Sequence, residues 1–260
     1  MEGFILAAGL GTRLRPLTDD RPKALVEIPV ERRVESGEWR TENVSLLEIA
    51  IRRLEEAGVE HIVINVHHFA EKVIDFVRGR QWQAAIDISD ERAMLLDTGG
   101  GLKKASGLFS GRENVLVHNV DILSDVDLRD VERQHREKGN LVTLCVSRRV
   151  TKRMLEFGED GLLVGRSSNT LLSQPQVAAS SPSLGEQSNS TALAFSGISV
   201  VSPGLFGLLP EAGGPYPVID EYIRLSASGE RIGSYLHSAE RWLDVGKPET
   251  LEKARLWRLS

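Results

Sequence analysis

The stretch from Gly3 to Ile28, GFILAAGLGTRLRPLTDDRPKALVEI, constrains the fold more than any other part of the chain. It opens on the apolar run Phe4–Ala8, which has the length and composition of a buried parallel strand. The run leads directly into Gly9-Leu10-Gly11, and glycines in such a turn let backbone N–H groups approach an anion closely. A strand that ends in a glycine-rich turn predicts an α/β fold with an anion site at the carboxyl end of that strand.

Two cations follow the turn, Arg13 and Lys23, and both suit the phosphates of a nucleoside triphosphate. Pro16 and Pro22 restrict the segment that carries them, so less entropy is lost when it closes on a ligand. The segment matches neither a Walker A loop, which has Lys before Ser or Thr, nor the dinucleotide fingerprint, which needs a third glycine at Leu14.

The residues from Leu6 to Lys23 do resemble the signature of the sugar-phosphate nucleotidyltransferases, L-A-A-G-x-G-T-R-x-x-P-L-T-x-x-x-P-K. Three later segments fit the same family: DTGGG from Asp97, FSGI from Phe195 and WLDVG from Trp242. Together they resemble most the short bacterial members, the mannose-1-phosphate guanylyltransferases and N-acetylmuramate 1-phosphate uridylyltransferases. The resemblance implies a Rossmann-like, mostly parallel mixed sheet flanked by helices, the GT-A-like fold of nucleotide-diphospho-sugar transferases.

The resemblance also implies roles for individual residues. It gives four catalytic residues, of which the two aspartates would hold Mg²⁺: Arg13, Lys23, Asp121 and Asp244. It places these residues at the nucleotide: Ala7, Ala8, Gly9, Gly11, Thr12, Arg13, Asp90, Glu91, Gly99 and Gly100. It places three residues at the sugar: Thr98, Asn119 and Gly197. For Gly197, a plain strand bulge is the competing interpretation.

Composition sets limits on the class of protein. A chain of 260 residues with 41% hydrophobic and 27% charged residues has room for one large α/β domain, and we expect a single domain over 1–260. The net charge of −5 argues against a general nucleic-acid surface. The chain has one cysteine and no run of about 18 apolar residues, so we expect a cytoplasmic protein without a disulfide framework or a membrane partner.

Periodicity indicates alternating strands and helices. After the signature, strands are expected over 61–66, 86–89, 115–123, 141–146, 192–201 and 232–236, and helices over 45–57, 70–78, 218–228 and from Asp97 and Pro248. Residues 29–43 are expected to form an exposed hairpin insertion, residues 158–163 a further hairpin and the polar residues 167–190 a mobile excursion. No hexapeptide repeat follows, so we expect no appended β-helix.

Several polar residues have ordinary structural explanations. His67 and His68 are interpreted as loop residues rather than metal ligands, because no acidic or cysteine partner stands at ligand spacing. Asp125 and Asp127 have the spacing of a glycosyltransferase D-x-D motif, but turn and helix-start roles suit them better. Many relatives carry an E-K-P lysine after the strand that ends near Val146. Three cations here could replace it, and the sequence does not choose among them: Arg148, Arg149 and Lys152.

The reaction implied by the resemblance is attack of a sugar 1-phosphate on the α-phosphorus of a nucleoside triphosphate, giving a nucleotide sugar and pyrophosphate. A phosphate monoester has a second pKa of about 6, so it needs no catalytic base at neutral pH, and positioning and charge neutralisation carry the rate. The alternatives left open are a phosphocholine-type cytidylyltransferase and a non-catalytic nucleotide-sugar-sensing subunit. The sequence also leaves open the base, the sugar and the oligomeric state, a homo-oligomer included.

Overall fold

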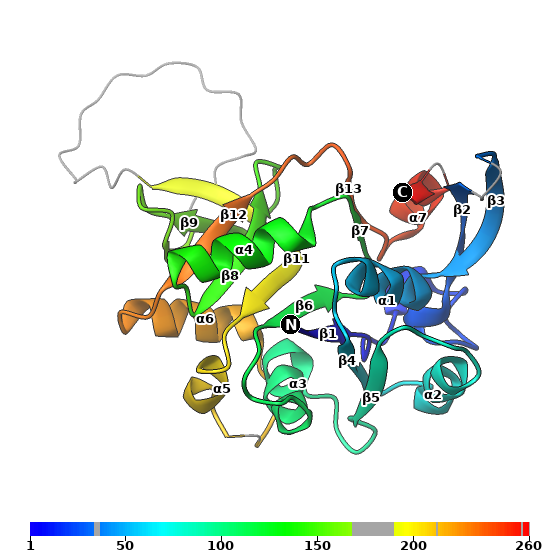
Figure 1. Ribbon diagram of the computed structural model, residues 1–260, viewed down its shortest axis with the longest axis horizontal. Coiled ribbons are helices and arrows are strands. Elements are labelled where there is room, and N and C mark those ends of the chain that lie inside the picture. Colours follow the sequence, from blue (N-terminus) through cyan, green and yellow to red (C-terminus); the bar gives the residue numbers. More distant parts are fainter. Residues whose placement is uncertain (34–36, 168–189, 212, 256, 260) are drawn as a thin grey trace.

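Strands alternate with helices in much of the chain, whereas the strands at 142–147, 154–157, 163–166 and 191–201 follow one another without a described helix between them, as Figure 1 shows. The computed structural model describes residues 1–33, 37–167, 190–211, 213–255 and 257–259. The strands are β1 (Glu2–Leu6), β2 (Glu27–Arg33), β3 (Trp39–Ser45), β4 (His61–Val66), β5 (Ala85–Asp90), β6 (Val115–Asn119), β7 (Ile122–Ser124), β8 (Val142–Ser147), β9 (Met154–Phe157), β10 (Leu163–Arg166), β11 (Thr191–Val201), β12 (Ile232–Leu236), β13 (Trp242–Asp244) and β14 (Arg258–Leu259). The helices are α1 (Leu46–Glu56), α2 (Ala70–Arg78), α3 (Asp97–Ala105), α4 (Leu128–Lys138), α5 (Leu205–Leu208), α6 (Val218–Ala227) and α7 (Pro248–Ala254), with 3-10 turns at Thr12–Leu14, Lys23–Leu25 and Ser106–Leu108.

Strand β1 lies inside the nine-stranded main sheet, paired in parallel with β4 on one side and β6 on the other. The path of the sheet runs β10-β9-β11-β6-β1-β4-β5, and β8 pairs with both β11 and β12. Strand β11 runs antiparallel to β6, β8 and β9, so the sheet is mixed. The predicted α/β fold, a mostly parallel mixed sheet flanked by helices, is confirmed.

Both faces of the sheet are covered, because neighbouring residues of β1 belong to different cores. Ile5 packs in a cluster with residues of α1, α2 and α4. Phe4, which points to the opposite face, packs in a second cluster with residues of α3, α5 and α6. Burial on both faces explains why the strands are nearly continuous apolar runs. Cys145 of β8 is fully buried in the first cluster, and burial raises the pKa of its thiol, so it is an inert core residue.

Local sequence explains where the helices begin and end. Ser45 caps α1, since its side chain accepts a hydrogen bond from the Glu48 amide at 3.2 Å, and the chain leaves this helix at Gly58 with φ of 86°. Pro248 starts α7 at its first position. The predicted helices over 45–57, 70–78 and 218–228 and those from Asp97 and Pro248 are all confirmed within one or two residues.

Two strand predictions need correction. The first strand ends at Leu6 rather than at Ala8, because the amides of Ala7 and Ala8 bond to a side chain instead of a neighbouring strand. The predicted strand over 115–123 is two strands, β6 and β7, with a turn at Val120 and Asp121 between them. The turn leaves Asp121 just beyond the end of β6, at the edge of the sheet where β1 also ends.

The predicted hairpin is present as β2 and β3, which pair antiparallel from Glu27 with Ser45 to Arg33 with Trp39. It is only partly exposed, since Val30 is fully buried. Strand β14 adds to it in parallel, and α7 lies beside it at the right of Figure 1. That the hairpin is an insertion stays a prediction. The turn expected over 158–163 joins β9 to β10, whereas most of the excursion predicted over 167–190 lies outside the described residues.

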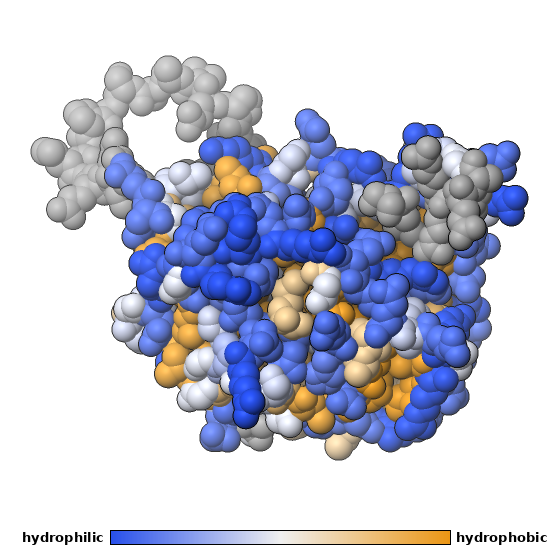
Figure 2. Space-filling model, viewed as in Figure 1, coloured by the Kyte–Doolittle hydropathy of each residue, from blue (hydrophilic) through white to orange (hydrophobic). Residues whose placement is uncertain are grey.

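Hydrophilic residues cover most of the face seen in Figure 2, with smaller hydrophobic areas between them. Among the residues that the structure describes, no helix combines the length and the apolar composition needed to cross a membrane.

Candidate active site

The glycine turn after β1 is held in one conformation by short contacts. Gly11 has φ of 67°, and a Cβ atom there would lie 3.0 Å from Thr18 Cγ2, so a larger residue would be both strained and crowded. The carbonyl of Gly11 accepts hydrogen bonds from the Leu14 amide and the Thr18 hydroxyl, both at 2.9 Å. The turn therefore presents Thr12 and Arg13 in a fixed loop at the end of β1.

Asn65, near the end of β4, fixes the start of this loop and was missed by the sequence analysis. Its Oδ1 accepts hydrogen bonds from the amides of Ala7 at 2.7 Å and Ala8 at 3.2 Å. Its Nδ2 donates to Glu91 Oε1 at 2.7 Å, and the other Glu91 oxygen accepts from the Leu96 amide at 3.1 Å. The one clue in the sequence is a polar residue in an otherwise apolar strand, at the end where parallel strands carry their sites.

Glu91 and Asp90, predicted at the nucleotide, have side chains engaged elsewhere in this structure. Glu91 is buried beneath the loop, and burial raises the pKa of its carboxyl although the hydrogen bonds from Asn65 and Leu96 oppose the rise. Asp90 forms an ion pair with Arg92 at 2.6 Å. Glu91 thus contacts the glycine loop through Asn65, and a direct contact of either residue with a base stays a prediction.

Three of the four predicted charged residues meet at one buried glycine, Gly246, and the fourth pairs with one of these three. A Cβ atom at Gly246 would lie 2.7 Å from Arg13 Nη2, 2.8 Å from Asp244 Oδ1 and 3.1 Å from Asp121 Oδ2. Lys23 forms an ion pair with Asp121. Residues from the start, middle and end of the chain therefore lie close together, and their catalytic and metal-binding roles stay predictions.

Strand pairing explains how Asp121 and Asp244 come together. Strand β13 runs antiparallel to β7, with Asp244 opposite Ile122, the residue that follows Asp121. The Val245 amide donates to the Asp121 carbonyl at 2.9 Å, and the Gly246 amide donates to Asp244 Oδ1 at 2.8 Å. The short β7–β13 ladder is thus the element that brings the second motif to the first.

Two adjoining cavities open beside these charges. The Lys23 cavity, of about 480 Å³, is lined by Leu6–Gly9, Lys23, Asn65, Leu95, Asp97, Thr98, Asn119–Asp121 and Pro215. The Asp244 cavity, of about 700 Å³, includes Asp97, Thr98, Asn119, Arg149, Gly197, Trp242 and Asp244 in its lining. The two cavities share Leu6, Asp97, Thr98 and Asn119, so Thr98 and Asn119, predicted at the sugar, stand between them.

The glycines that open α3 are packing residues in this structure. A Cβ atom at Gly99 would collide with the Tyr216 ring, and one at Gly100 would lie 2.9 Å from the Gly214 carbonyl. Thr98 Oγ1 accepts a hydrogen bond from the Val218 amide at 2.9 Å, at the start of α6. Gly99 and Gly100 are not among the described lining residues of either cavity, and their predicted contact with nucleotide stays a prediction.

Gly197 lies at an irregularity of β11, where the register against β8 shifts between Phe195 and Ser199. Its φ is 76°, and a Cβ atom there would lie 2.8 Å from Ile122 and 3.0 Å from Asn119 Nδ2. The bulge foreseen as one interpretation is therefore present. Because Gly197 also lines the Asp244 cavity, its predicted contact with a sugar stays open.

Of the three cations that could replace the family's lysine, Arg149 lines the Asp244 cavity. Its guanidinium lies 3.9 Å from the centre of the Trp242 ring and donates to the Phe195 carbonyl. Burial lowers the pKa of Arg149, whereas the nearby Asp244 carboxylate raises it. Arg148 and Lys152 are exposed and are not among the described residues of that lining.

The remaining polar residues have structural roles. His67 Nδ1 contacts the Glu91 carbonyl at 2.8 Å, while His68 is exposed and makes a tilted ring contact with Phe69. Asp127 caps α4 by accepting hydrogen bonds from the Arg129 and Asp130 amides, and Asp125 forms an ion pair with Arg241. The cap confirms the helix-start role predicted for Asp127, whereas the turn role predicted for Asp125 stays a prediction.

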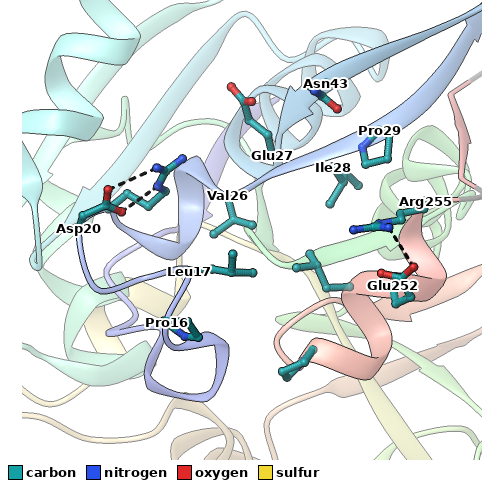
Figure 3. Close-up of a pocket in the computed structure, with 13 residues that line it drawn as sticks. Pro16, Leu17, Asp20, Val26, Glu27, Ile28, Pro29, Asn43, Glu252 and Arg255 are labelled. Carbon is teal, nitrogen blue, oxygen red and sulfur yellow. Dashed lines mark hydrogen bonds and ion pairs between the residues drawn. The ribbon is translucent and has the colours of Figure 1, made fainter.

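A third cavity, larger at about 820 Å³, lies on the other side of the signature loop, between Pro16–Leu17, β2 and α7 (Figure 3). In that view Leu17, Val26 and Ile28 form an apolar surface, while the Asp20 and Glu252 ion pairs lie at either side. Its described lining contains none of the four catalytic residues predicted from the sequence. The larger volume of this third cavity therefore does not identify it as the active site.

Known proteins resemble this chain in both sequence and fold. Residues 2–159 match the family model described as nucleotidyl transferase. N-acetylmuramate alpha-1-phosphate uridylyltransferase of Caulobacter vibrioides is 33% identical over 95% of this chain and 92% of its own length. This chain belongs to the nucleotidyl transferase family. The sugar-phosphate nucleotidyltransferase resemblance predicted from Leu6–Lys23 is thereby confirmed.

Two further similar proteins show that the comparisons do not decide which nucleotide this chain uses. The mannose-1-phosphate guanylyltransferase catalytic subunit beta of Dictyostelium discoideum is 25% identical over 96% of this chain, which spans 62% of that protein's length. The crystal structure of HddC from Yersinia pseudotuberculosis superposes with a TM-score of 0.70 at 20% identity, covering 98% of this chain and 97% of that one, and supports the fold alone. Both uridylyl- and guanylyltransferases are thus among the relatives of this nucleotidyltransferase.

Proposed function

We propose that this nucleotidyltransferase is a Mg²⁺-dependent uridylyltransferase that condenses UTP with a sugar 1-phosphate to give a UDP-sugar and pyrophosphate. The observation that carries the activity is the convergence of Arg13, Asp121 and Asp244 on Gly246, with Lys23 on Asp121. The choice of uracil is supported by the full-length likeness to a uridylyltransferase at 33% identity. Relatives that transfer guanylyl groups are matched at lower identity.

The arrangement suits an in-line displacement in which an oxygen of the sugar 1-phosphate forms a bond to the α-phosphorus of UTP. The bond that breaks joins this phosphorus to the oxygen of the departing pyrophosphate. The attacking phosphate is already largely dianionic at neutral pH because its second pKa is about 6, so no side chain need remove a proton. What the protein must supply is positive charge and positioning.

Each cation has a task in this reaction. Arg13, exposed on the fixed loop, is placed to bind the β- and γ-phosphates through its fork of N–H donors. Lys23 lines the Lys23 cavity and would neutralise the α-phosphate. Arg149, in the adjoining Asp244 cavity, would bind the incoming sugar phosphate in place of the family's lysine. The Lys23 cavity would then hold the nucleotide and the Asp244 cavity the sugar.

The donor set at Gly246 fits magnesium. Asp121 and Asp244 supply two carboxylates, and no group of three or more His, Cys, Asp or Glu side chains at metal-binding distance occurs among the described residues. Mg²⁺ is commonly bound by one or two carboxylates together with substrate phosphates rather than by an all-protein cage. When bound, it would neutralise negative charge on the reacting phosphates.

The experiment measures pyrophosphate released from UTP, GTP, CTP, dTTP and ATP with a panel of sugar 1-phosphates and Mg²⁺. We expect UTP to be the preferred nucleotide and Asp121→Asn to lower kcat by roughly 10²–10³-fold, by analogy with removal of one preorganised transition-state donor. Asp125→Asn is the matched control, since Asp125 belongs to the same segment but pairs with Arg241. Preference for GTP would overturn the uridylyl assignment, and full activity of Asp121→Asn would overturn the site.

A further inference from the structure

Asn65 and Glu91 form a buried polar pair that joins two segments of the Lys23 cavity. The two residues are 2% and 1% exposed, and they lie at the ends of the neighbouring strands β4 and β5. Asn65 Oδ1 accepts hydrogen bonds from the Ala7 and Ala8 amides of the signature loop. Glu91 Oε2 accepts one from the Leu96 amide, in the segment that leads into α3. The proposed reaction gives neither side chain a task.

The Glu91 carboxylate fixes which way the Asn65 amide faces. Glu91 Oε1 accepts from Asn65 Nδ2 at 2.7 Å, so Asn65 Oδ1 is turned toward the two amides of the loop. Burial raises the pKa of Glu91, yet both of its oxygens face N–H donors, an arrangement that suits the ionised carboxylate. With the Asn65 amide reversed, donor would face donor and acceptor would face acceptor, which is costly in a buried site.

The third glycine of the DTGGG segment makes room for this pair. A Cβ atom at Gly101 would lie 2.8 Å from Glu91 Oε1 and 3.0 Å from Asn65 Nδ2, the two atoms that share the hydrogen bond. Gly101 lies inside α3, where alanine has the higher helix propensity. The close approach of the pair therefore explains why this position of the helix carries no side chain.

The segments that the pair joins belong to one cavity more than to the other. Ala7, Ala8 and Leu95 line the Lys23 cavity, as does Asn65 itself. None of these four is among the described lining residues of the Asp244 cavity. A change in the pair should therefore shift the walls around the nucleotide and leave most of the sugar cavity in place.

We propose that Asn65 and Glu91 are positioning residues that set the affinity for the nucleoside triphosphate, because they fix the spacing of two walls of the Lys23 cavity. The inference rests on the proposed function, in which this cavity holds the nucleotide. The pair acts through the backbone amides of both walls rather than on the reacting phosphates. Its disruption should therefore raise KM for the nucleotide and change kcat little.

The test exchanges the two functional groups of the pair. Glu91→Gln puts a second amide beside Asn65, so one donor must lose its acceptor, and we expect KM for the nucleotide to rise roughly 10-fold with kcat within about threefold. Asn65→Asp alone puts two carboxylates in contact and should raise this KM at least as much. The double variant has one carboxylate and one amide in exchanged places, and every donor again meets an acceptor. Its KM should return to within about threefold of that of the unsubstituted protein.

Pyrophosphate release is measured with the nucleotide that the unsubstituted protein prefers among UTP, GTP, CTP, dTTP and ATP. KM is determined separately for this nucleotide and for the sugar 1-phosphate, and the latter should change less than about threefold. Gly101→Ala crowds the pair from α3 without altering either partner, so it should raise the nucleotide KM alone. Glu60→Gln is the matched control, since Glu60 is exposed just before β4 and is not among the described lining residues of either cavity.

Thermal unfolding of each variant separates positioning from support of the fold. A lower Tm with an unchanged nucleotide KM would mean that the pair only stabilises the protein, and equal rises in both KM values would mean that it does not act on the nucleotide cavity. Either result overturns the inference, as does a double variant that fails to recover the KM. If Glu91→Gln does not fold, Gly101→Ala and the double variant decide the question in the same way.

These outcomes leave the transferase activity standing. Release of no pyrophosphate by the unsubstituted protein, with any of the five nucleotides and any acceptor, would instead overturn the proposed function and this inference with it.

Discussion

Gly246 is the residue around which the predicted catalytic side chains pack most closely. Its own backbone is not in the left-handed region, so alanine would be conformationally acceptable, but the added methyl would stand within 3.1 Å of Arg13, Asp244 and Asp121 side-chain atoms. Those atoms are the ends of side chains and can move aside. We therefore expect Gly246→Ala to fold and to lower kcat/KM by roughly 10²-fold, because a displacement of about 1 Å in a catalytic group can cost that much.

Steady-state kinetics and thermal unfolding of Gly246→Ala test this expectation. We expect its Tm to differ from that of the unsubstituted protein by no more than about 2–4 °C. Gly107→Ala is the control, since a Cβ atom there meets nothing within 4 Å and the residue is not among the described lining residues of either cavity. A Gly246→Ala enzyme with unchanged kcat/KM would show that the three side chains need not meet at this point for catalysis.

At the residue scale, the sequence predicts the site residues that belong to fixed motifs and few others. Arg13 and Lys23 belong to one contiguous signature, and Asp121 and Asp244 each end a recognisable apolar segment. Asn65 carries no such motif, because its importance comes from two amides that are 57 and 58 residues away in the chain. The choice of Arg149 over its neighbours likewise depends on the position of Trp242, which no local pattern reveals.

At the scale of elements, the strands β1, β4 and β5 are joined at their amino ends by a charged cluster. His61 of β4 lies opposite Glu2 of β1, with Nδ1 at 2.8 Å from Glu2 and Nε2 at 3.0 Å from Asp87 of β5. Burial alone would lower the pKa of His61, but its contacts with Glu2 and Asp87 raise it above its ordinary value. Burial alone would raise the pKa of Glu2, but hydrogen bonds from His61 and Ser110 lower it.

The sign of the pH dependence follows from these two shifts. The raised His61 pKa gives stability that is fully present below about pH 6.5 and is lost as the pH rises through the folded-state pKa. The lowered Glu2 pKa gives stability that is present above its ordinary value of 4.5 and is lost as the pH falls. The cluster should therefore stabilise the fold most between these limits.

We expect His61→Gln to lower Tm more at about pH 6 than at about pH 9, because glutamine keeps a donor but never carries the charge. His68→Gln is the matched control, since His68 is exposed and makes a tilted ring contact with Phe69. Thermal unfolding of the three proteins across this range measures the difference. A Tm deficit that is the same at both pH values would contradict a charged His61 in the folded protein.

Element boundaries show where sequence reasoning reaches its limit. The starts of α1 and α7 are predictable because Ser45 at the N-cap and Pro248 at the first helical position act locally. Strand ends at the site were not, because Ala7 and Ala8 continue the apolar run of β1 yet bond to Asn65, and Asp121 interrupts a run that continues as β7. In both places the departure from regular pairing is what exposes the backbone or the carboxylate to the cavity.

At the scale of the whole molecule, the site is assembled from three distant parts of the chain. The signature loop supplies Arg13 and Lys23, the β6–β7 turn supplies Asp121, and β13 supplies Asp244. The fold class was predictable because alternating strands and helices with short connections allow few sheet arrangements. The base was not, because the side chains of Asp90 and Glu91 pair with Arg92 and Asn65 and no motif in the sequence distinguishes uracil from guanine; the proposal of uracil rests on likeness to a relative.

The assembly of the candidate site from separate segments predicts how the Tm of the protein changes with Mg²⁺ and UTP. The described residues offer Mg²⁺ two carboxylates, one of them already paired with Lys23, so Mg²⁺ alone should raise Tm by less than about 1 °C. Under the proposed function UTP would supply the remaining oxygens, so both ligands together, at about 100 times the dissociation constant of their complex, should add about 2.7 kcal/mol, or roughly 5–10 °C in Tm. A thermal-shift series with Mg²⁺, UTP and both together measures this, with Asp244→Asn expected to lose the joint effect. A large shift from Mg²⁺ alone would instead mean that the protein binds the ion by itself, before any nucleotide.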